Sequence, residues 1–390
     1  MDDQARPFGA EYGFGAYIHW PYCARICPYC DFNVYAAKDR DNSSLLAAIT
    51  TDIARHGERL SGHPNLTSIY FGGGTPSLLS GAEIAQLIDA CETAFGVIPG
   101  AEITLEANPH MVTPSLAGDW RAAGVNRLSL GVQSLQDEAL TFLGRDHSAN
   151  DARIALDTAL EVFSSVSIDL IYARPDQHTD DWVRELTEAL ALGAQHVSLY
   201  ELTIEPATPF GKAAARGTLV PMTDDTQADL FELTHAIMSD AGCSAYEISN
   251  FARAANFRSQ HNLTYWRSGD WIGVGPGAHG RLSIDGKRYA TEAARRPNTY
   301  MTATRSEPDS ILPDVPLSAD ETAREILAMG LRTIDGIASS RLEETREGLV
   351  NHDRRLELQS DGWLIESDNR LTLTPAGRLL ADKIVAELLG

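Results

Sequence analysis

The chain has 390 residues, of which 43% are hydrophobic and 22% are charged, a composition typical of a soluble globular protein with two or three domains and a large core. Its formal net charge of −22 disfavours a nucleic-acid partner and a broad electrostatic contact with anionic lipid, because both require a positive surface. No uninterrupted apolar run reaches membrane-spanning length, and the start, MDDQARPFGAEYGFG, lacks the basic and apolar regions of a secretory signal, so we expect a cytoplasmic protein with reduced thiols.

Strand-like and helix-like segments alternate over the first two-thirds of the chain, which indicates a parallel sheet with crossover helices. The predicted strands are 16–20, 68–71, 102–106, 127–131, 165–171 and 196–202. The predicted helices between them are 44–60, 81–95, 113–123, 150–163 and 179–192. Six such units fit a partial or full β/α barrel, in which the chemistry is expected beyond the C-terminal ends of the strands.

Three closely spaced cysteines follow the first predicted strand. Cys23, Cys27 and Cys30 form a C-x3-C-x2-C run within YIHWPYCARICPYCDFNVY. This spacing suits one 4Fe–4S cluster in which three irons take a cysteine and the fourth is left without a protein sulfur. A cluster with an open iron is suited to binding and reducing a small molecule.

Structural zinc is the alternative for this run, but zinc sites usually close with four ligands in paired short spacings, and the sequence has no second cysteine pair. His19 could supply a fourth ligand, although a histidine at the end of an apolar strand is more often packed or hydrogen-bonded. Cys91 and Cys243 stand alone in helix-like contexts and are expected to be buried thiols. Disulfides are disfavoured, since five cysteines cannot all pair.

The motifs HWPYC, CPYCDF and the later FGGGTPS resemble the radical S-adenosylmethionine (radical SAM) superfamily, and more narrowly its coproporphyrinogen dehydrogenase-like branch. The resemblance implies an open barrel of six units. It also implies that the methionine moiety of S-adenosylmethionine chelates the fourth iron, and that one electron from the cluster cleaves the sulfonium to a 5′-deoxyadenosyl radical. In such enzymes the cofactor carries the chemistry, and the protein positions it and excludes solvent.

Further motifs at the predicted strand ends match segments of the family that contact S-adenosylmethionine. Glycines such as those of FGGGTPS let the backbone pass close to a ligand. A carboxylate in EANP can accept both ribose hydroxyls, and a buried aspartate in SIDLIY needs a partner or a role. Arginine, as in LGRDHS, is suited to a carboxylate. The S-adenosylmethionine contacts carried over by resemblance are Tyr17, Tyr29, Gly73, Gly74, Thr75, Glu106, Gln133, Arg145 and Asp169.

The segment after Thr208, GKAAARGTLVPMTDDT, is expected to be an exposed loop, and a helix is predicted over 226–241. The polar and aromatic run SQHNLTYW follows. His261, Tyr265 and Trp266 could wall a flat macrocycle, with the histidine able to ligate iron. A packed aromatic corner of the barrel explains the same residues equally well. The glycine-rich WIGVGPGAHGRL lacks the context of a dinucleotide fingerprint.

The last part of the chain changes character. Helices are predicted over 319–330, 340–358 and 375–389, with a hairpin at 362–365 and 370–373, an arrangement that resembles a winged helix. Its acidic surroundings argue against DNA and favour a lid or partner surface over the barrel mouth. The predicted domains are a tail (1–15), the radical SAM barrel core (16–225), an extension closing the barrel (226–312) and a winged-helix-like domain (313–390).

Within the branch, the chain resembles the HemW-type haem chaperones more than the dehydrogenases. Only 16 residues precede Tyr17, where the dehydrogenases carry an arm, and Asp31-Phe32-Asn33 follows the cysteines without a fourth cysteine. The resemblance implies a haem-binding chaperone with a cluster and S-adenosylmethionine, supplying apo-haemoproteins such as respiratory enzymes and receiving electrons from a donor. The alternative is radical decarboxylation of coproporphyrinogen III propionates. Use of the radical chemistry, homodimerisation and transient membrane association stay open.

Overall fold

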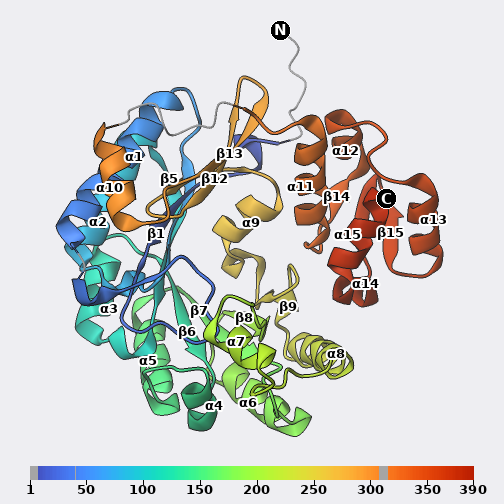
Figure 1. Cartoon of the computed structure of the whole chain (residues 1–390), viewed down its shortest axis with the longest axis horizontal. Coiled ribbons are helices and arrows are strands. Elements are labelled where there is room, and N and C mark those ends of the chain that lie inside the picture. The colour runs from blue at the N-terminus through green and yellow to red at the C-terminus, as the bar shows by residue number, and fades with distance from the viewer. Residues whose placement is uncertain (1–7, 40, 307–314) are drawn as a thin grey trace.

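The computed structural model describes residues 8–39, 41–306 and 315–390. Its main feature is a long sheet whose centre is made of six parallel strands, each next to its successor in the chain (Figure 1). These strands are β1 (Phe14–Trp20), β4 (Leu66–Gly73), β5 (Val97–Ala107), β6 (Arg127–Gln133), β7 (Ser165–Tyr172) and β8 (His196–Glu201). The helices connecting them are α1 (Asn42–Arg59), α2 (Gly81–Phe95), α3 (Pro114–Ala122), α4 (Asp137–Phe142), α5 (Ala149–Val162) and α6 (Thr179–Ala191). The predicted α/β architecture is confirmed.

The segment after β8 widens this sheet at both edges. Strand β11 (Asp270–Val274) adds in parallel outside β1, and β12 (His279–Ile284) and β13 (Lys287–Glu292) continue antiparallel from it. At the other edge, β10 (Asn250–Ala252) pairs antiparallel with β8, and β9 (Ser244–Ala245) pairs antiparallel with β10. In the described part of the chain β13 and β9 do not pair, so the sheet is open. The predicted domain limits stay a prediction.

The local sequence explains where the barrel helices begin. In α1, α2, α3 and α5 a polar side chain accepts a hydrogen bond from a free amide of the first turn, as Asp41 does for α1 and Thr113 for α3. Ser80 and Glu83 form a reciprocal capping box at the start of α2. The central strands are largely buried on both faces, since helices cover one face and the barrel interior covers the other. Residues such as Ile18, Phe71 and Leu105 belong to the apolar core, whereas alternate positions carry buried polar side chains such as Ser68, Thr104 and Ser129. This packing fixes the C-terminal strand ends, where the site lies.

Three predictions of local structure, one loop and two helices, were wrong in detail. The expected loop after Thr208 contains helix α7 (Pro209–Ala215), which Thr208 caps at Gly211 and which has proline at its first position. The predicted helix 340–358 is two helices, α12 (Ser339–Thr345) and α13 (His352–Ser360). Gly348, with φ of 67°, turns the chain between them, and Asn351 caps the second. The last predicted helix also divides, into α14 (Pro375–Leu379) and α15 (Ala381–Leu389).

The C-terminal part has its own sheet and its own apolar core. Helix α11 (Ala319–Leu331) precedes β14 (Ile337–Ala338), and the predicted hairpin is confirmed as β15 (Leu364–Ser367) and β16 (Arg370–Leu373). Asp368 and Asn369 both have positive φ, as the tight turn of such a hairpin requires. The core is built from residues 323–388, and the buried Phe8, from the other end of the chain, belongs to it.

Ionic contacts tie this part to the barrel extension. Within the extension, buried Arg288 pairs with buried Asp270 at 3.2 Å, and the Arg288 guanidinium lies 5.6 Å from the ring centre of Phe8, which belongs to the C-terminal core. Arg281 donates three hydrogen bonds, from its Nε and Nη2 groups, to the Glu325 carboxylate on α11. Of the helices in the described ranges, none combines the length and apolar character needed to cross a membrane.

Candidate functional site

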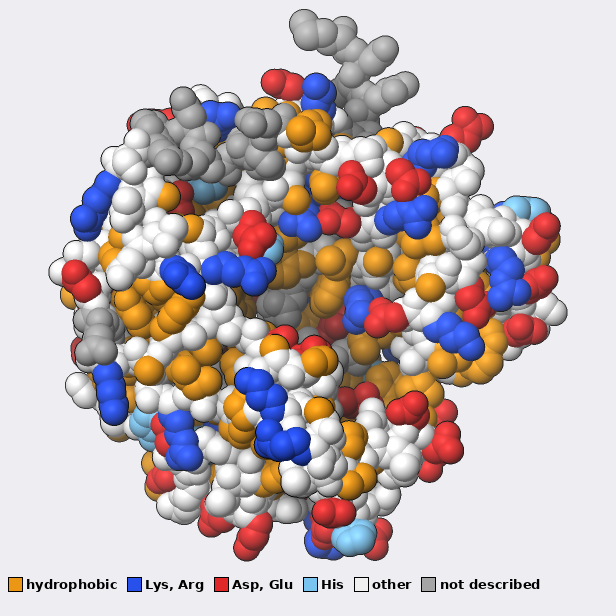
Figure 2. Space-filling view, in the orientation of Figure 1, with side chains coloured by type: hydrophobic (Ala, Val, Ile, Leu, Met, Phe, Trp, Pro, Cys, Tyr) orange, Lys and Arg blue, Asp and Glu red, His pale blue; other side chains and the backbone are white. Residues whose placement is uncertain are grey.

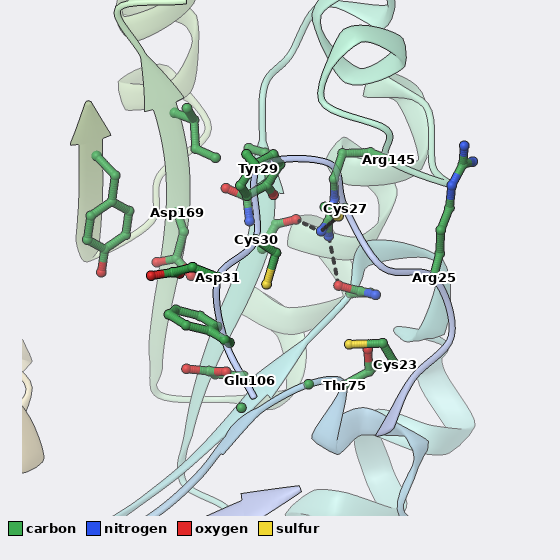
Figure 3. A pocket seen from close by; sticks show the side chains of 18 of the residues that line it. Cys23, Arg25, Cys27, Tyr29, Cys30, Asp31, Thr75, Glu106, Arg145 and Asp169 are labelled. Atoms are coloured by element: carbon green, nitrogen blue, oxygen red, sulfur yellow. Dashed lines mark hydrogen bonds between the residues drawn. The ribbon is translucent and has the colours of Figure 1, made fainter. Parts of the chain in front are cut away.

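The loop after β1 brings the three predicted cysteine ligands to one cavity. Its two ends are held together because β2 (Tyr22–Cys23) pairs in parallel with β3 (Tyr35–Ala36). Cys23, Cys27 and Cys30 line a cavity of about 490 Å³ beyond the C-terminal ends of the central strands. Figure 3 shows the sulfur atoms of Cys23 and Cys30 directed into the same space. We call this space the cysteine cavity.

The chemistry of the donor set fits an iron–sulfur cluster. All three cysteines are free thiols. Burial raises the pKa of Cys23 to about 11 and also raises the pKa of Cys30, so these thiols would release protons on binding metal. Among the side chains that the structure describes, no three His, Cys, Asp or Glu converge closely enough to hold a single metal ion. Three thiols spread around a shared cavity match a cluster in which three of the four irons each take one cysteine.

His19 is hydrogen-bonded through both ring nitrogens. Its Nδ1 lies 3.0 Å from the Tyr17 hydroxyl and its Nε2 lies 3.0 Å from the Asn33 carbonyl oxygen. The ring is buried, and burial lowers its pKa. His19 does not line the cysteine cavity. It is therefore a packed, hydrogen-bonded histidine, as the sequence favoured, rather than a fourth ligand.

The glycines of FGGGTPS are required by close contacts with the cysteine loop and β1 that the sequence did not predict. The Gly74 amide donates to the Trp20 carbonyl oxygen at 2.7 Å, and the Thr75 amide donates to that of Tyr22 at 2.9 Å. A Cβ on Gly74 would lie 2.7 Å from the Tyr22 oxygen, and one on Gly73 would lie 2.6 Å from the His19 ring. These glycines therefore let β4 pack against the start of the cysteine loop, and they also line the cysteine cavity.

Two carboxylates enter the cavity from β5 and β7, the two strands that flank β6 (Figure 3). Glu106, on β5, accepts a hydrogen bond of 2.7 Å from the Tyr70 hydroxyl, and burial raises its pKa to about 7. Asp169, on β7, accepts from the Ser129 hydroxyl at 3.3 Å, and burial also raises its pKa. Partly buried carboxylates of this kind can accept ligand hydroxyls and favour a positively charged ligand.

Arg145 is held within the protein instead of standing free for a carboxylate. It donates to the Cys27 sulfur at 3.3 Å, to Asn108 Oδ1 at 2.7 Å and to the Gly131 carbonyl oxygen at 3.0 Å. Its buried Nε has no hydrogen-bond partner in the described residues. Arg145 thus orients Cys27 and keeps its Nε donor unused.

Gln133 lines the same cavity from a backbone with φ of 66°, which is unusual for a residue other than glycine.

A second cavity, of about 640 Å³, adjoins the first and shares four lining residues with it: Asp31, Phe32, Gly73 and Glu106. We call it the aromatic cavity, because Tyr17, Tyr70, Tyr265, Trp271 and Phe32 line it together with His19, His261 and His279. Figure 2 shows the molecule hollowed near the centre of the face viewed, in the region that α9 occupies in Figure 1. Aromatic cavities of this size suit flat organic ligands.

The predicted haem residues lie on helix α9 (Gln260–Trp266) but do not all face this cavity. His261 is 1% exposed, and its ring nitrogens are hydrogen-bonded to the Ser68 hydroxyl at 2.9 Å and the Tyr265 hydroxyl at 2.6 Å. Burial lowers the His261 pKa to about 3, so the ring is neutral. Trp266 lines neither cavity and lies under the Arg332 guanidinium.

The start of α9 is fixed by a carboxylate that sequence reasoning missed. Glu102 accepts hydrogen bonds from the amides of Gln260 and His261, at 3.0 and 3.1 Å, and from the Ser259 hydroxyl at 3.3 Å. The glycine-rich return also has a positioning role. A Cβ on Gly277 would lie 2.5 Å from Asn33 Nδ2, so that return packs directly on the cysteine loop.

The structure therefore brings together most of the predicted S-adenosylmethionine contacts. Tyr29, Gly73, Gly74, Thr75, Glu106, Gln133, Arg145 and Asp169 all line the cysteine cavity. Tyr17 lines the aromatic cavity instead. Tyr70 and Asn108, which bond Glu106 and Arg145, were not predicted. The Asn108-Pro109 pair, two residues after Glu106, was the sequence feature that could have identified Asn108 as a residue of the site.

Comparison with known proteins gives the family. Residues 17–189 match the model of the Radical SAM superfamily, and residues 317–380 match that of the HemN C-terminal domain. The chain is 38% identical to radical S-adenosyl methionine domain-containing protein 1, mitochondrial, of Bos taurus, over 96% of this chain and 86% of the relative. It is 37% identical to the heme chaperone HemW of Mycobacterium tuberculosis, over 97% and 95% of the two chains.

The heme chaperone HemW of Escherichia coli is 36% identical, over 95% of this chain and 96% of the relative. Among solved structures, the coproporphyrinogen III oxidase HemN from Escherichia coli superposes with a TM-score of 0.81 at 22% identity, covering 98% of this chain and 91% of that chain, which supports the fold. The chain belongs to the radical SAM superfamily and, within it, to the family of the HemW haem chaperones.

Proposed function

We propose that this chain is a cytoplasmic haem chaperone that binds haem in the aromatic cavity and passes it to apo-haemoproteins such as respiratory enzymes. The observation that carries the proposal is the aromatic cavity itself, which has three histidines in its lining and adjoins the cysteine cavity. The name of the relatives at 36% and 37% identity supports the same activity. A separate one-electron donor would serve the cluster.

Membership of the radical SAM superfamily implies a 4Fe–4S cluster and S-adenosylmethionine as cofactors. We assign the cluster to Cys23, Cys27 and Cys30. A reduced cluster of this kind supplies one electron to a bound sulfonium. The chain's own part is to hold and shield these groups: Arg145 orients Cys27, and Glu106 offers a carboxylate to the ribose hydroxyls.

Haem would lie against the tyrosine rings and Trp271, with His261 as the iron ligand. The neutral ring of His261 is suited to that role. Its Nε2 would have to exchange the 2.6 Å hydrogen bond with Tyr265 for the iron, while Nδ1 keeps its bond to Ser68. Such a bond on the second ring nitrogen fixes the orientation of a ligating histidine.

Haem titration of the anaerobically reconstituted chain tests this assignment. His261→Ala is expected to change the Soret spectrum and weaken binding, because the iron loses its ligand. His352→Ala, which removes an exposed histidine of α13, is the matched control and should bind like the unaltered chain. An unchanged spectrum for His261→Ala would remove His261 from the site. Transfer is measured by adding an apo-haemoprotein to the haem-loaded chain and following its own Soret band.

The dehydrogenase alternative makes a different prediction. Incubation of the reduced, reconstituted chain with coproporphyrinogen III and S-adenosylmethionine should leave the porphyrinogen unchanged if the chain is a chaperone. Formation of protoporphyrinogen would overturn the proposal. Haem binding alone does not decide between the two, since flat macrocycles bind to many apolar clefts.

A further inference from the structure

Tyr70 lies in the wall between the two cavities and contacts one residue of each, Glu106 and His261. Tyr70, on β4, donates its hydroxyl to Glu106 Oε1 at 2.7 Å, and Glu106 lines both cavities. The Tyr70 ring stacks on the His261 ring, with centroids 5.0 Å apart and planes inclined by 23°. One side chain therefore contacts both the carboxylate of the cysteine cavity and the histidine of the aromatic cavity.

The packing leaves this wall little freedom. A Cβ on Gly72 would lie 3.0 Å from the rings of Tyr17 and Tyr70 and 3.2 Å from Glu106 Oε1. The Tyr17 ring lies 6.2 Å from that of Tyr70 and 6.3 Å from that of His261. On its far side, His261 is bonded to Ser68 and Tyr265. A displacement of Glu106 is therefore passed to Tyr70 and from there to His261, because close-packed groups cannot move separately.

We propose that Tyr70 couples the two cavities, so that S-adenosylmethionine in the cysteine cavity strengthens haem binding in the aromatic cavity. This inference rests on the proposed function. Ribose hydroxyls donated to Glu106 fix its carboxylate, and the fixed carboxylate holds the Tyr70 hydroxyl. The Tyr70 ring then keeps His261 in one orientation, and haem meets a pre-organised ligand. By linkage, haem strengthens nucleotide binding by the same factor.

A thermodynamic cycle tests the coupling. Haem dissociation constants are measured on anaerobically reconstituted, unreduced chain with and without saturating S-adenosylmethionine. We expect the nucleotide to tighten haem binding about fivefold, at the lower end of known coupling factors. Tyr70→Phe keeps the ring against His261 and removes the hydroxyl from Glu106, so the factor should fall to about one. A purely structural role would weaken both haem constants and leave their ratio unchanged.

Tyr172→Phe is the matched control. Tyr172, on β7, donates its hydroxyl to Glu201 at 3.1 Å, and Glu201 lines the cysteine cavity alone. The control thus removes a tyrosine–glutamate bond of the same kind without touching the wall, and it should retain the full coupling factor. Hydrogen exchange of the unaltered chain provides a second test that needs no variant. S-adenosylmethionine alone should slow hydrogen exchange of the α9 amides, because it fixes His261 through Tyr70.

The outcomes separate the two proposals. If haem does not bind, the proposed function itself fails. If both ligands bind but the factor is one in the unaltered chain, or Tyr70→Phe keeps it, the role of Tyr70 is refuted and the proposed function stands. Unchanged exchange of α9 on adding S-adenosylmethionine also refutes it.

Discussion

Gly74 offers a sharp test of how the cysteine loop is positioned. In Gly74→Ala the new Cβ would lie 2.7 Å from the Tyr22 carbonyl oxygen and 2.9 Å from that of Trp20. Both contacts are with backbone, so no side chain can rotate away. The end of β4 must therefore move off the segment that leads directly into Cys23.

The magnitude follows from the contacts that are lost. Overpacking of this kind costs about 1–3 kcal/mol. Movement of β4 also weakens the hydrogen bonds from Gly74 and Thr75 to the cysteine loop, each of which contributes about 1 kcal/mol. These effects overlap, since moving apart relieves the clash by breaking the bonds. We expect a total destabilisation of about 2–4 kcal/mol.

The assay compares Gly74→Ala with Gly118→Ala by denaturant unfolding and by iron and sulfide content after anaerobic reconstitution. Gly118 lies in α3, and a Cβ there would meet nothing within 4 Å. The control should therefore be neutral or stabilised by about 0.5–1 kcal/mol, and it should load fully with iron. If Gly74→Ala unfolds at the same denaturant concentration as the control and binds as much iron, the argument from backbone contact is wrong.

Three further predictions concern the site. Cys30→Ser should lose most reconstituted iron because the cluster loses a thiolate, while Cys91→Ala, at a buried position of helix α2, should keep it; metal analysis compares them. Glu102→Ala should weaken haem binding and lower the free energy of unfolding by about 1–3 kcal/mol, since two amides of α9 lose their acceptor; haem titration and denaturant unfolding measure this. For Glu106, a pKa of about 7 against an ordinary 4.5 means that its contribution to stability is present below about pH 4.5 and lost as the pH rises through about 7. Glu106→Gln should remove up to about 3 kcal/mol of this pH dependence, seen by unfolding both chains at about pH 5 and pH 8.

Each of these has a contrary result. Equal iron in the two cysteine variants would refute the cluster assignment. Unchanged haem affinity in the Glu102 variant would show that the cap of α9 does not position His261. If the free energies of unfolding of Glu106→Gln and of the unaltered chain changed with pH in the same way, the raised pKa of Glu106 would be refuted. The Glu106 side chain is only partly buried, and contact with solvent in the cavity would then explain the result.

The parallel core and the cysteine cavity could be predicted because their signals are local. Each strand carries its own apolar run, and the cysteines lie within eight residues of one another. Strand β11 pairs with β1 across more than half of the chain, and no local pattern reports such a partner. Helix α7 was missed although Thr208 followed by proline is a helix-start signal, since the segment after Thr208 shows little apolar core of its own and was therefore predicted to be an exposed loop.

The same limit applies inside the site. Glu106 was predicted from a motif, but its partner Tyr70 sits in β4 as one more strand residue, and only the register of β4 against β5 brings the two together. The glycines of FGGGTPS were predicted to bring the backbone close to a ligand, which stays a prediction, and the structure adds a close approach within the protein. What they approach, the backbone of Trp20 and Tyr22, depends on the pairing of β1 with β4.

The position of Phe8 sets an order on folding. Phe8 is synthesised long before the helices that bury it, and its ring, stacked near the Arg288–Asp270 pair, stays uncovered until they emerge. Domains generally fold from the N-terminus during synthesis. Here the earliest described side chain acquires its neighbours last, so the barrel strands can pair before Phe8 is buried, and the C-terminal core closes on it only after residues 323–388 have been synthesised.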